Sequence, residues 1–224
     1  MLFVTLKTKV LEDFMGISLV KPSLSKLAIA LACGLLLSFN SAFAAPESPS
    51  QGIKRVIELV QVTVTKEKAT LSEEALDAKL RDLIAPLFNF DEMARRCLGN
   101  NWKKATEAQQ KEFVSLFSDL LGRTYLKRIK RNAESSKITE ISDEITDDKA
   151  FVKSTVRAED EDIAIDYRLI LQNGEWKIYD VIVENVGLVT NYRSEFPEII
   201  RHEGFEGLLQ RLRNKQVAPP KEKA

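Results

Sequence analysis

The first half of the chain carries apolar residues at the spacing of amphipathic helices. The earliest stripe recurs every three or four residues and consists of Ile53, Val56, Ile57 and Val60. A second stripe follows Ser72, a residue type that commonly begins helices, and consists of Leu76, Leu80, Leu83, Ile84, Leu87 and Phe88. Both stripes predict helices that bury one face against a core.

Two more helices are predicted further along. Asp91 is expected to cap a short helix that ends near Leu98 and Gly99. Thr106 and Gln109 have the spacing of a capping box that opens a long helix, whose apolar face is Phe113, Leu116, Phe117, Leu120, Leu121 and Tyr125. Its last turns are basic, which suits the C-terminal end of a helix, and carry Arg123, Lys127, Arg128, Lys130 and Arg131.

From Ile138 the apolar period changes to two, which predicts antiparallel strands. The alternating positions form three groups: Ala150, Val152, Ser154 and Val156; Ile163, Ile165, Tyr167, Leu169 and Leu171; and Trp176, Ile178 and Ile182. Turns are expected at residues 146–148 and at Asn173-Gly174, a typical hairpin pair. Both faces of the last strand are apolar, since Tyr179, Val181 and Val183 alternate with Trp176, Ile178 and Ile182, so neither face is expected to meet water.

The C-terminal part is predicted to contain a helix over Leu188–Ile200, a second helix near Phe205–Leu212, and a polar tail, Gln216–Ala224, that is expected to be disordered. Helices followed by strands indicate an α+β fold. We expect an antiparallel sheet of about four to five strands, packed against a helical N-terminal half and two C-terminal helices.

The N-terminus has the pattern of a secretory signal peptide. Lys21 and Lys26 precede the apolar run Leu27–Phe39, and small residues follow at Ala42 and Ala44. We predict a signal over residues 1–44, cut after Ala44, and a single domain over residues 45–215. Acidic residues near position 12 suit a signal poorly, so Met15 is an alternative start.

Two other interpretations of this segment remain open. A transmembrane anchor needs about 20 apolar residues, which is more than this run supplies. A lipoprotein signal ending at Cys33 would stop the apolar run early and leave Leu35, Leu36 and Leu37 in the mature chain.

Composition narrows the classes of partner. The 224 residues include 33 Lys and Arg against 33 Asp and Glu. This balance lacks the positive excess of a nucleic-acid binder, so nucleic acid is not an expected partner. Removal of the signal leaves Cys97 as the one cysteine, which permits no internal disulfide. Cys97 shares the apolar side of its helix with Phe90 and Met93, and we expect it to be buried rather than reactive.

Motifs for catalysis or metal binding are lacking in the sequence. His202 is the single histidine and has no partner at ligand spacing. A nucleophile elbow, a phosphate-binding glycine loop and HExxH are likewise absent. We therefore predict no catalytic residue, no metal and no cofactor. Asp180 has two interpretations: a general base in a cavity, or a buried carboxylate that is hydrogen-bonded to backbone or to an arginine.

The order of several motifs resembles the MlaC-type periplasmic phospholipid-binding proteins, also called the toluene-tolerance family. These motifs are Phe90–Arg95 leading into Leu98-Gly99 and Trp102, Phe113 to Tyr125 with its Phe-x-x-x-Phe core, Tyr167, Gly174–Val181, Val186–Val189 and Asn191–Phe196. The resemblance covers about residues 53–212. One departure is Asn185-Val186-Gly187, where the family usually has Gly-Val-Ser.

The resemblance implies a periplasmic phospholipid shuttle that acts in outer-membrane lipid asymmetry and toluene tolerance. The implied fold is a strongly curved sheet and helices that enclose a lipid cavity, with phospholipid as cargo. The implied partners are an outer-membrane lipoprotein complex and an inner-membrane ABC transporter with an MCE-domain component. We expect a monomer.

Candidate site residues follow from this expectation. The acyl cavity is predicted to be lined by Phe117, Leu121, Tyr125, Val152, Val156, Ile165, Tyr167, Leu169, Ile178 and Ile182. Tyr192 and Arg193 are expected at the cavity mouth, and headgroup selectivity is expected to be weak. The basic run, Arg123, Lys127, Arg128, Lys130 and Arg131, is expected to dock on an acidic partner surface.

Two other functions remain as alternatives. One is a cavity enzyme that uses Asp180 and Tyr167 as acid and base. The other is a lipid-free adaptor that bridges envelope proteins, since a fold alone does not define a site. Phospholipid that co-purifies with the protein is expected only from the shuttle.

Overall fold

The computed structural model describes residues 47–158 and 161–217. The predicted signal peptide and the cut after Ala44 lie outside the described residues. The helices are α3 (Pro49–Glu67), α4 (Glu73–Ile84), α5 (Phe90–Leu98), α6 (Glu107–Asn132) and α7 (Leu188–Arg213), with 3₁₀ turns η1 (Ala85–Leu87) and η2 (Gly99–Lys104). The strands are β1 (Lys137–Thr146), β2 (Lys149–Ala158), β3 (Glu161–Gln172), β4 (Glu175–Val183) and β5 (Val186–Gly187). The α+β prediction is confirmed.

Polar side chains begin most of the helices. Ser72 caps α4, and Thr106 and Gln109 form the predicted capping box of α6. The cap of α5 is Asn89 rather than the expected Asp91, because the Asn89 side chain accepts the backbone N–H of Glu92 at 2.9 Å. Asp91 instead lies in the first turn, where its negative charge favours the helix dipole.

The five strands form one antiparallel sheet in the order β1-β2-β3-β4-β5. Asn173 and Gly174 both have positive φ, so they form the hairpin turn predicted between β3 and β4. Glu184 and Asn185 also have positive φ, at 49° and 63°, and turn the chain into the short strand β5. The sequence did not indicate β5, because a two-residue strand has no periodicity.

A β-bulge between β3 and β4 changes which residues share a face of the sheet. Arg168 pairs with Asp180 and Leu169 pairs with Ile178, so Tyr179 is the extra residue of β4. The extra residue reverses the alternation, and Ile178 and Ile182 lie on opposite faces. The prediction that these two isoleucines share a face was wrong, because a strict period of two takes no account of an inserted residue.

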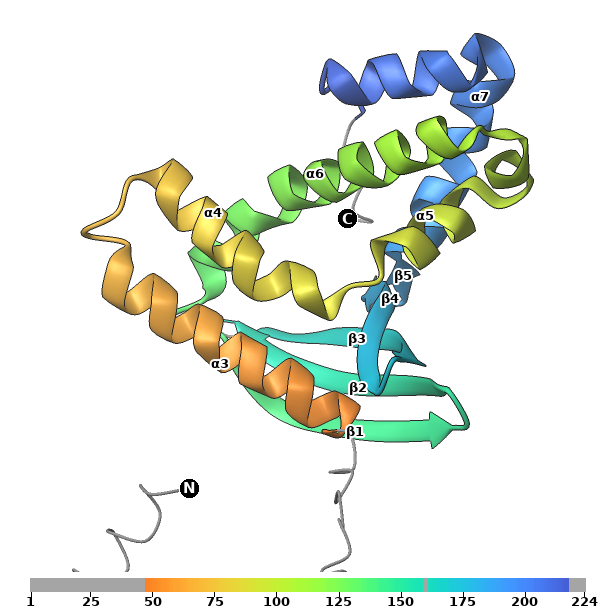
Figure 1. The fold of residues 1–224 in the computed structure, drawn as a ribbon. Helices are drawn as coiled ribbons and strands as arrows, with labels where there is room; N and C mark the ends of the chain where they lie inside the picture. Colours follow the sequence, from red (N-terminus) through yellow and green to blue (C-terminus); the bar gives the residue numbers. More distant parts are fainter. Residues whose placement is uncertain (1–46, 159–160, 218–224) are drawn as a thin grey trace, which may run out of the picture. The chain divides into compact units, whose positions relative to one another are not determined.

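Two strand carboxylates hold helix N-termini against the sheet. Asp143 of β1 accepts hydrogen bonds from the backbone nitrogen and the hydroxyl of Ser50 in α3, at 2.9 and 2.7 Å. Asp180 of β4 accepts one from the backbone nitrogen of Val189 in α7, at 3.0 Å. The strand register places Asp143 and Asp180 on opposite faces. Consequently α3 lies along one face, over β1 and β2, while α7 meets β4 on the other (Figure 1).

The buried apolar residues form three clusters. A helical cluster joins α5, α6 and α7 and includes Met93, Cys97, Phe113, Phe117, Tyr192, Phe196 and Leu208. A second cluster joins α3, α4 and α6 around Val60, Leu80 and Leu126. A third joins α3 to the sheet through Ile53, Val152, Leu169 and Ile178. The second and third clusters meet along α3, where the cavity described below is found.

The C-terminal helices and tail differ in detail from the sequence expectation. The two predicted helices form one element, α7, which contains Pro197 and has a break at Gly204, where φ is 72°. Gln216 and Val217, expected in the disordered tail, are packed: Gln216 donates its backbone N–H to Arg211, and Val217 is buried in the helical cluster. The remainder of the predicted tail, residues 218–224, lies outside the described residues.

Candidate functional site

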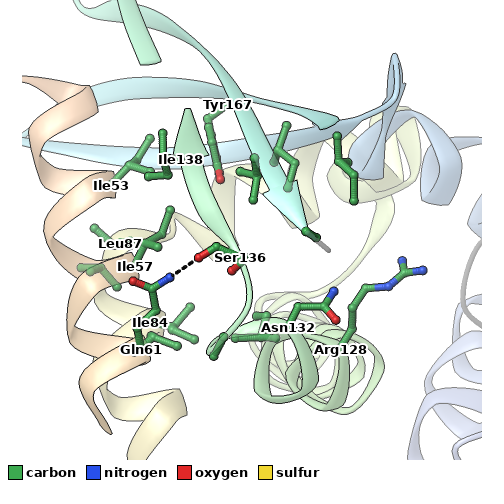
Figure 2. A pocket seen from close by; sticks show the side chains of 18 of the residues that line it. Ile53, Ile57, Gln61, Ile84, Leu87, Arg128, Asn132, Ser136, Ile138 and Tyr167 are labelled. Carbon is green, nitrogen blue, oxygen red and sulfur yellow. Dashed lines mark hydrogen bonds between the residues drawn. The ribbon is translucent and has the colours of Figure 1, made fainter. Parts of the chain in front are cut away.

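An apolar pocket of about 260 Å³ lies between α3, the end of α4, the end of α6 and the sheet. Its apolar lining is Ile53, Val56, Ile57, Val60, Ile84, Leu87, Phe88, Ile129, Ala133, Ile138, Val156, Ala158, Ile163, Ile165, Tyr167 and Ile178. The residues come from four separate elements, and those labelled in Figure 2 point toward a shared space. The lining therefore suits an apolar ligand rather than a polar one.

Four polar residues border the pocket, and they lie toward one end of it. Gln61 donates from Nε2 to the carbonyl oxygen of Ser136 at 2.7 Å, which ties α3 to the segment before β1 (Figure 2). Arg128 and Asn132, both on α6, complete this polar end. At the opposite end the Tyr167 side chain reaches the pocket, and burial raises the pKa of its hydroxyl to about 12. Tyr167 is consequently neutral at physiological pH.

The structure brings together four of the ten residues predicted for the acyl cavity. Val156, Ile165, Tyr167 and Ile178 line the pocket. Val152 and Leu169 are on the same sheet face but are packed in the core, with 0% and 2% exposure. Phe117 and Leu121 belong to the helical cluster, Ile182 is on the other sheet face, and Tyr125 lines a second hollow.

Tyr192 and Arg193 do not lie at the mouth of this pocket. Tyr192 is fully buried in the helical cluster, where its ring lies 5.0 Å from Phe196 and 5.2 Å from Phe117. Burial accordingly raises the pKa of the Tyr192 hydroxyl. Arg193 is exposed on α7 and does not line the pocket. The expectation for Tyr192 was wrong because consecutive helical residues face different directions, and its own stripe includes Phe196.

The basic run of α6 does not form one surface. Lys130 turns toward α4, where it forms ion pairs with Asp77 at 2.5 Å and Glu73 at 3.0 Å, and its side chain is only 14% exposed. Arg123, Arg128 and Arg131 line the second hollow, while Lys127 is exposed and lines neither cavity. These residues therefore have at least three different environments.

The second hollow is larger, about 1040 Å³, and adjoins the apolar pocket. Its walls come from α6, the β4–β5 turn, the start of α7 and the segment after α7. Arg128, Asn132 and Ile163 line both cavities, so the two meet at these residues. Unlike the apolar pocket, this hollow is bordered by several charged side chains.

Much of the pocket wall was missed by sequence reasoning. Ile53, Val56, Ile57 and Val60 were identified as a helical stripe but were assigned to ordinary core. Ile129, Ala133, Ile138 and Ile163 were not assigned to the cavity either. The one usable signal was that stripe of α3, since a pocket beside a sheet needs an opposing apolar wall.

Asp180 and Tyr167, the proposed acid and base of the enzyme alternative, are not brought together. They lie on opposite faces of the sheet, because Asp180 pairs with Arg168 and Tyr167 pairs with Val181. The Asp180 carboxylate accepts hydrogen bonds from Val189 and from Arg168, the latter at 3.3 Å. Burial raises the pKa of Asp180, and these bonds offset only part of that rise. The structural interpretation of Asp180 is therefore the correct one.

Other reactive groups have equally structural surroundings. Cys97 is fully buried, its thiol faces the carbonyl of Val189 at 3.8 Å, and burial raises its pKa. Within residues 47–158 and 161–217, no three His, Cys, Asp or Glu side chains gather in a way that suits a metal ion. The same part of the chain contains no helix that is both long and apolar enough to cross a bilayer.

Comparison with known proteins gives consistent matches. The model of the family described as "MlaC protein" matches residues 54–214. The "Intermembrane phospholipid transport system binding protein MlaC" of Haemophilus influenzae is 20% identical over 146 residues, which are 62% of this chain and 68% of that protein. A phospholipid-binding protein from Ralstonia solanacearum, solved in complex with a phospholipid, matches with a TM-score of 0.66 and 25% identity over 75% of this chain and 97% of its own. The resemblance seen in the motifs is thereby confirmed: the chain belongs to the MlaC family.

Proposed function

We propose that this protein carries phospholipid and that the apolar pocket holds acyl chain. The observation that carries the proposal is the lining itself, since its residues from α3, α6 and the sheet are almost all aliphatic. The names of the matched proteins support it, because one is a phospholipid transport binding protein and the other was solved with a phospholipid bound.

The energetics explain why lipid transfer across water needs a carrier. Exposure of an acyl chain to water costs about 0.8 kcal/mol per CH₂, so two chains of roughly fifteen carbons cost on the order of 20 kcal/mol. A phospholipid therefore does not cross an aqueous compartment alone at a useful rate. An enclosed aliphatic wall supplies the environment that the chains lose when they leave a membrane.

The pocket volume indicates how loading occurs. Ligand pockets usually measure ~300–1,000 Å³, whereas this one measures about 260 Å³. Two full acyl chains therefore require a wider pocket. The opposed walls are α3 and the sheet, and their separation is the movement that would enlarge it.

We further propose that the protein is periplasmic and moves lipid between an outer-membrane lipoprotein complex and an inner-membrane ABC transporter with an MCE-domain component. The predicted signal peptide and the word "intermembrane" in the name of the matched relative support this route. Lys127, which is exposed, is the clearest candidate for contact with an acidic partner surface.

Native mass spectrometry of protein purified from a bacterial envelope tests the carrier proposal. A mass increment equal to a phospholipid, lost on delipidation and regained from vesicles, is the expected result. Protein that stays lipid-free through purification and after incubation with vesicles would contradict it and favour the adaptor. Turnover of a small apolar substrate would instead favour an enzyme.

A further inference from the structure

The second hollow combines two properties that matter for a lipid headgroup: it is basic, and it adjoins the apolar pocket. Four basic side chains line it, namely Arg123, Arg128, Arg131 and Lys215. Its only acidic lining residues are Glu161 and Glu184, and Glu184 accepts the backbone N–H of Ala164 at 2.7 Å. The walls therefore carry a net positive charge beside an apolar cavity.

The arginines are arranged along one stretch of α6. Residues 123 and 131 are eight positions apart, which is about 12 Å along a helix axis at 1.5 Å per residue. Arg128 lies between them and also lines the apolar pocket, so it marks the junction of the two cavities. Thr124 and Asn191 add neutral hydrogen-bonding groups to the same walls.

The structure assigns this hollow as a vestibule for an anionic phospholipid headgroup, an inference that rests on the proposed carrier function and names its preferred substrate. A lipid whose chains occupy the apolar pocket must place its phosphate near the junction at Arg128. A guanidinium group offers paired donors to phosphate oxygens. This replaces the expectation of weak headgroup selectivity.

Net charge decides which headgroup is favoured. Phosphatidylethanolamine carries an ammonium group beside its phosphate, and that ammonium would enter a hollow lined by four cations. Phosphatidylglycerol and cardiolipin have no such group, and their glycerol hydroxyls can donate to Glu161 or accept from Asn191. The nearby apolar wall lowers the effective dielectric, so these charges act more strongly than on an open surface.

Competition between two lipids provides the test. Delipidated protein is incubated with vesicles that contain equal amounts of phosphatidylglycerol and phosphatidylethanolamine, and native mass spectrometry counts each complex. The wild type is expected to favour phosphatidylglycerol. In Arg123→Gln/Arg131→Gln the ratio should fall about threefold per arginine, which corresponds to roughly 0.7 kcal/mol each. High salt should lower the wild-type ratio as well.

A matched variant controls for net charge. Lys103 and Lys104 are exposed in η2 and line neither cavity, so Lys103→Gln/Lys104→Gln removes the same charge elsewhere. Its lipid ratio should equal that of the wild type. If the two double variants shift the ratio equally, or if neither does, the vestibule is overturned. Arg131→Lys keeps the charge and should retain most of the preference, whatever the stability of the double variant.

Further outcomes separate this inference from its neighbours. If the wild type takes up no lipid, the carrier function itself fails. If lipid is bound and the arginine variant keeps its ratio but loses capture by a membrane complex, the arginines dock a partner and the vestibule is wrong. Inorganic phosphate should stabilise the delipidated protein no more than chloride at equal ionic strength, and a specific rise in its melting temperature would identify free phosphate as the ligand and overturn the assignment.

Discussion

The Asp180 carboxylate accepts a hydrogen bond from the backbone nitrogen of Val189 at 3.0 Å, and this contact fixes the start of α7 on the sheet. The N-cap of α7 is Gly187, which has no side chain to cap with. Asp180 on β4 takes that role from a neighbouring strand. Its Oδ2 lies close to Gly187, where an added Cβ would come within 3.1 Å. The glycine at 187 therefore leaves room for a cap supplied from outside the helix.

Replacement of Asp180 tests this capping role. Asp180→Ala leaves the Val189 N–H and the positive end of α7 without a partner, and should lower the free energy of unfolding by about 1–3 kcal/mol. Asp180→Asn keeps an acceptor oxygen and should cost clearly less. Urea unfolding of the three proteins measures both differences. Equal losses for Ala and Asn would show that charge, and not the hydrogen bond, is what matters.

The buried carboxyl also predicts a pH dependence. Burial raises the pKa of Asp180 above its ordinary value of 3.8. A carboxyl whose pKa is higher in the folded state binds more protons when folded, so its contribution is complete below the ordinary pKa and is lost as pH rises through the raised one. The stability of the wild type relative to Asp180→Asn should therefore fall between about pH 3 and pH 7. A difference that is constant or rises with pH would contradict the assigned direction.

Partner docking has its own probe in Lys127. This residue is exposed near the end of α6 and lines neither cavity, so it can change binding to a partner without a change in lipid contact. Lys127→Glu should slow association with an acidic partner surface and leave the melting temperature and lipid content unchanged. Surface plasmon resonance at low salt measures the association rate, with Lys66→Glu on α3 as the exposed control. Equal rates for the two variants would remove Lys127 from the interface.

Export is tested at the N-terminus. A signal over residues 1–44 predicts that protein recovered from the periplasm begins at Ala45. Edman sequencing reads this directly. A lipid-modified Cys33 or an uncut chain in the inner membrane would instead support one of the two alternative interpretations of that segment.

The helices and their order were predictable because each has a strong local signal. Ser72 and Thr106 begin their helices as expected, and the stripe with Phe113 and Phe117 is buried. The hairpin at Asn173-Gly174 was predictable for the same reason, since its residues tolerate the positive φ that the turn requires. These features depend on residues that are neighbours in the sequence.

The pocket was only partly predictable because it depends on contacts between distant segments. Val152 and Val156 have the same residue type, strand and face, yet one is packed and the other borders a cavity. Periodicity assigns a face, but it does not say whether the opposing helix touches that face. The bulge at Tyr179 is a second limit, since one inserted residue moved Ile182 away from the face of Ile178.

That contrast supplies the most direct test of lipid binding in the pocket. Val152 is 0% exposed in the packed core, whereas Val156 borders the cavity. Val152→Trp should overpack the core and cost about 1–3 kcal/mol or more. Val156→Trp should fill the open space, keep the fold with a loss below about 1 kcal/mol, and abolish co-purified phospholipid.

The decisive measurement is native mass spectrometry of Val156→Trp purified from the envelope, with its melting temperature recorded beside the wild type and Val152→Trp. Folded protein without phospholipid is the result that a lipid pocket between α3 and the sheet predicts. A folded Val156→Trp that carries a full complement of phospholipid, or one as destabilised as Val152→Trp, would contradict it.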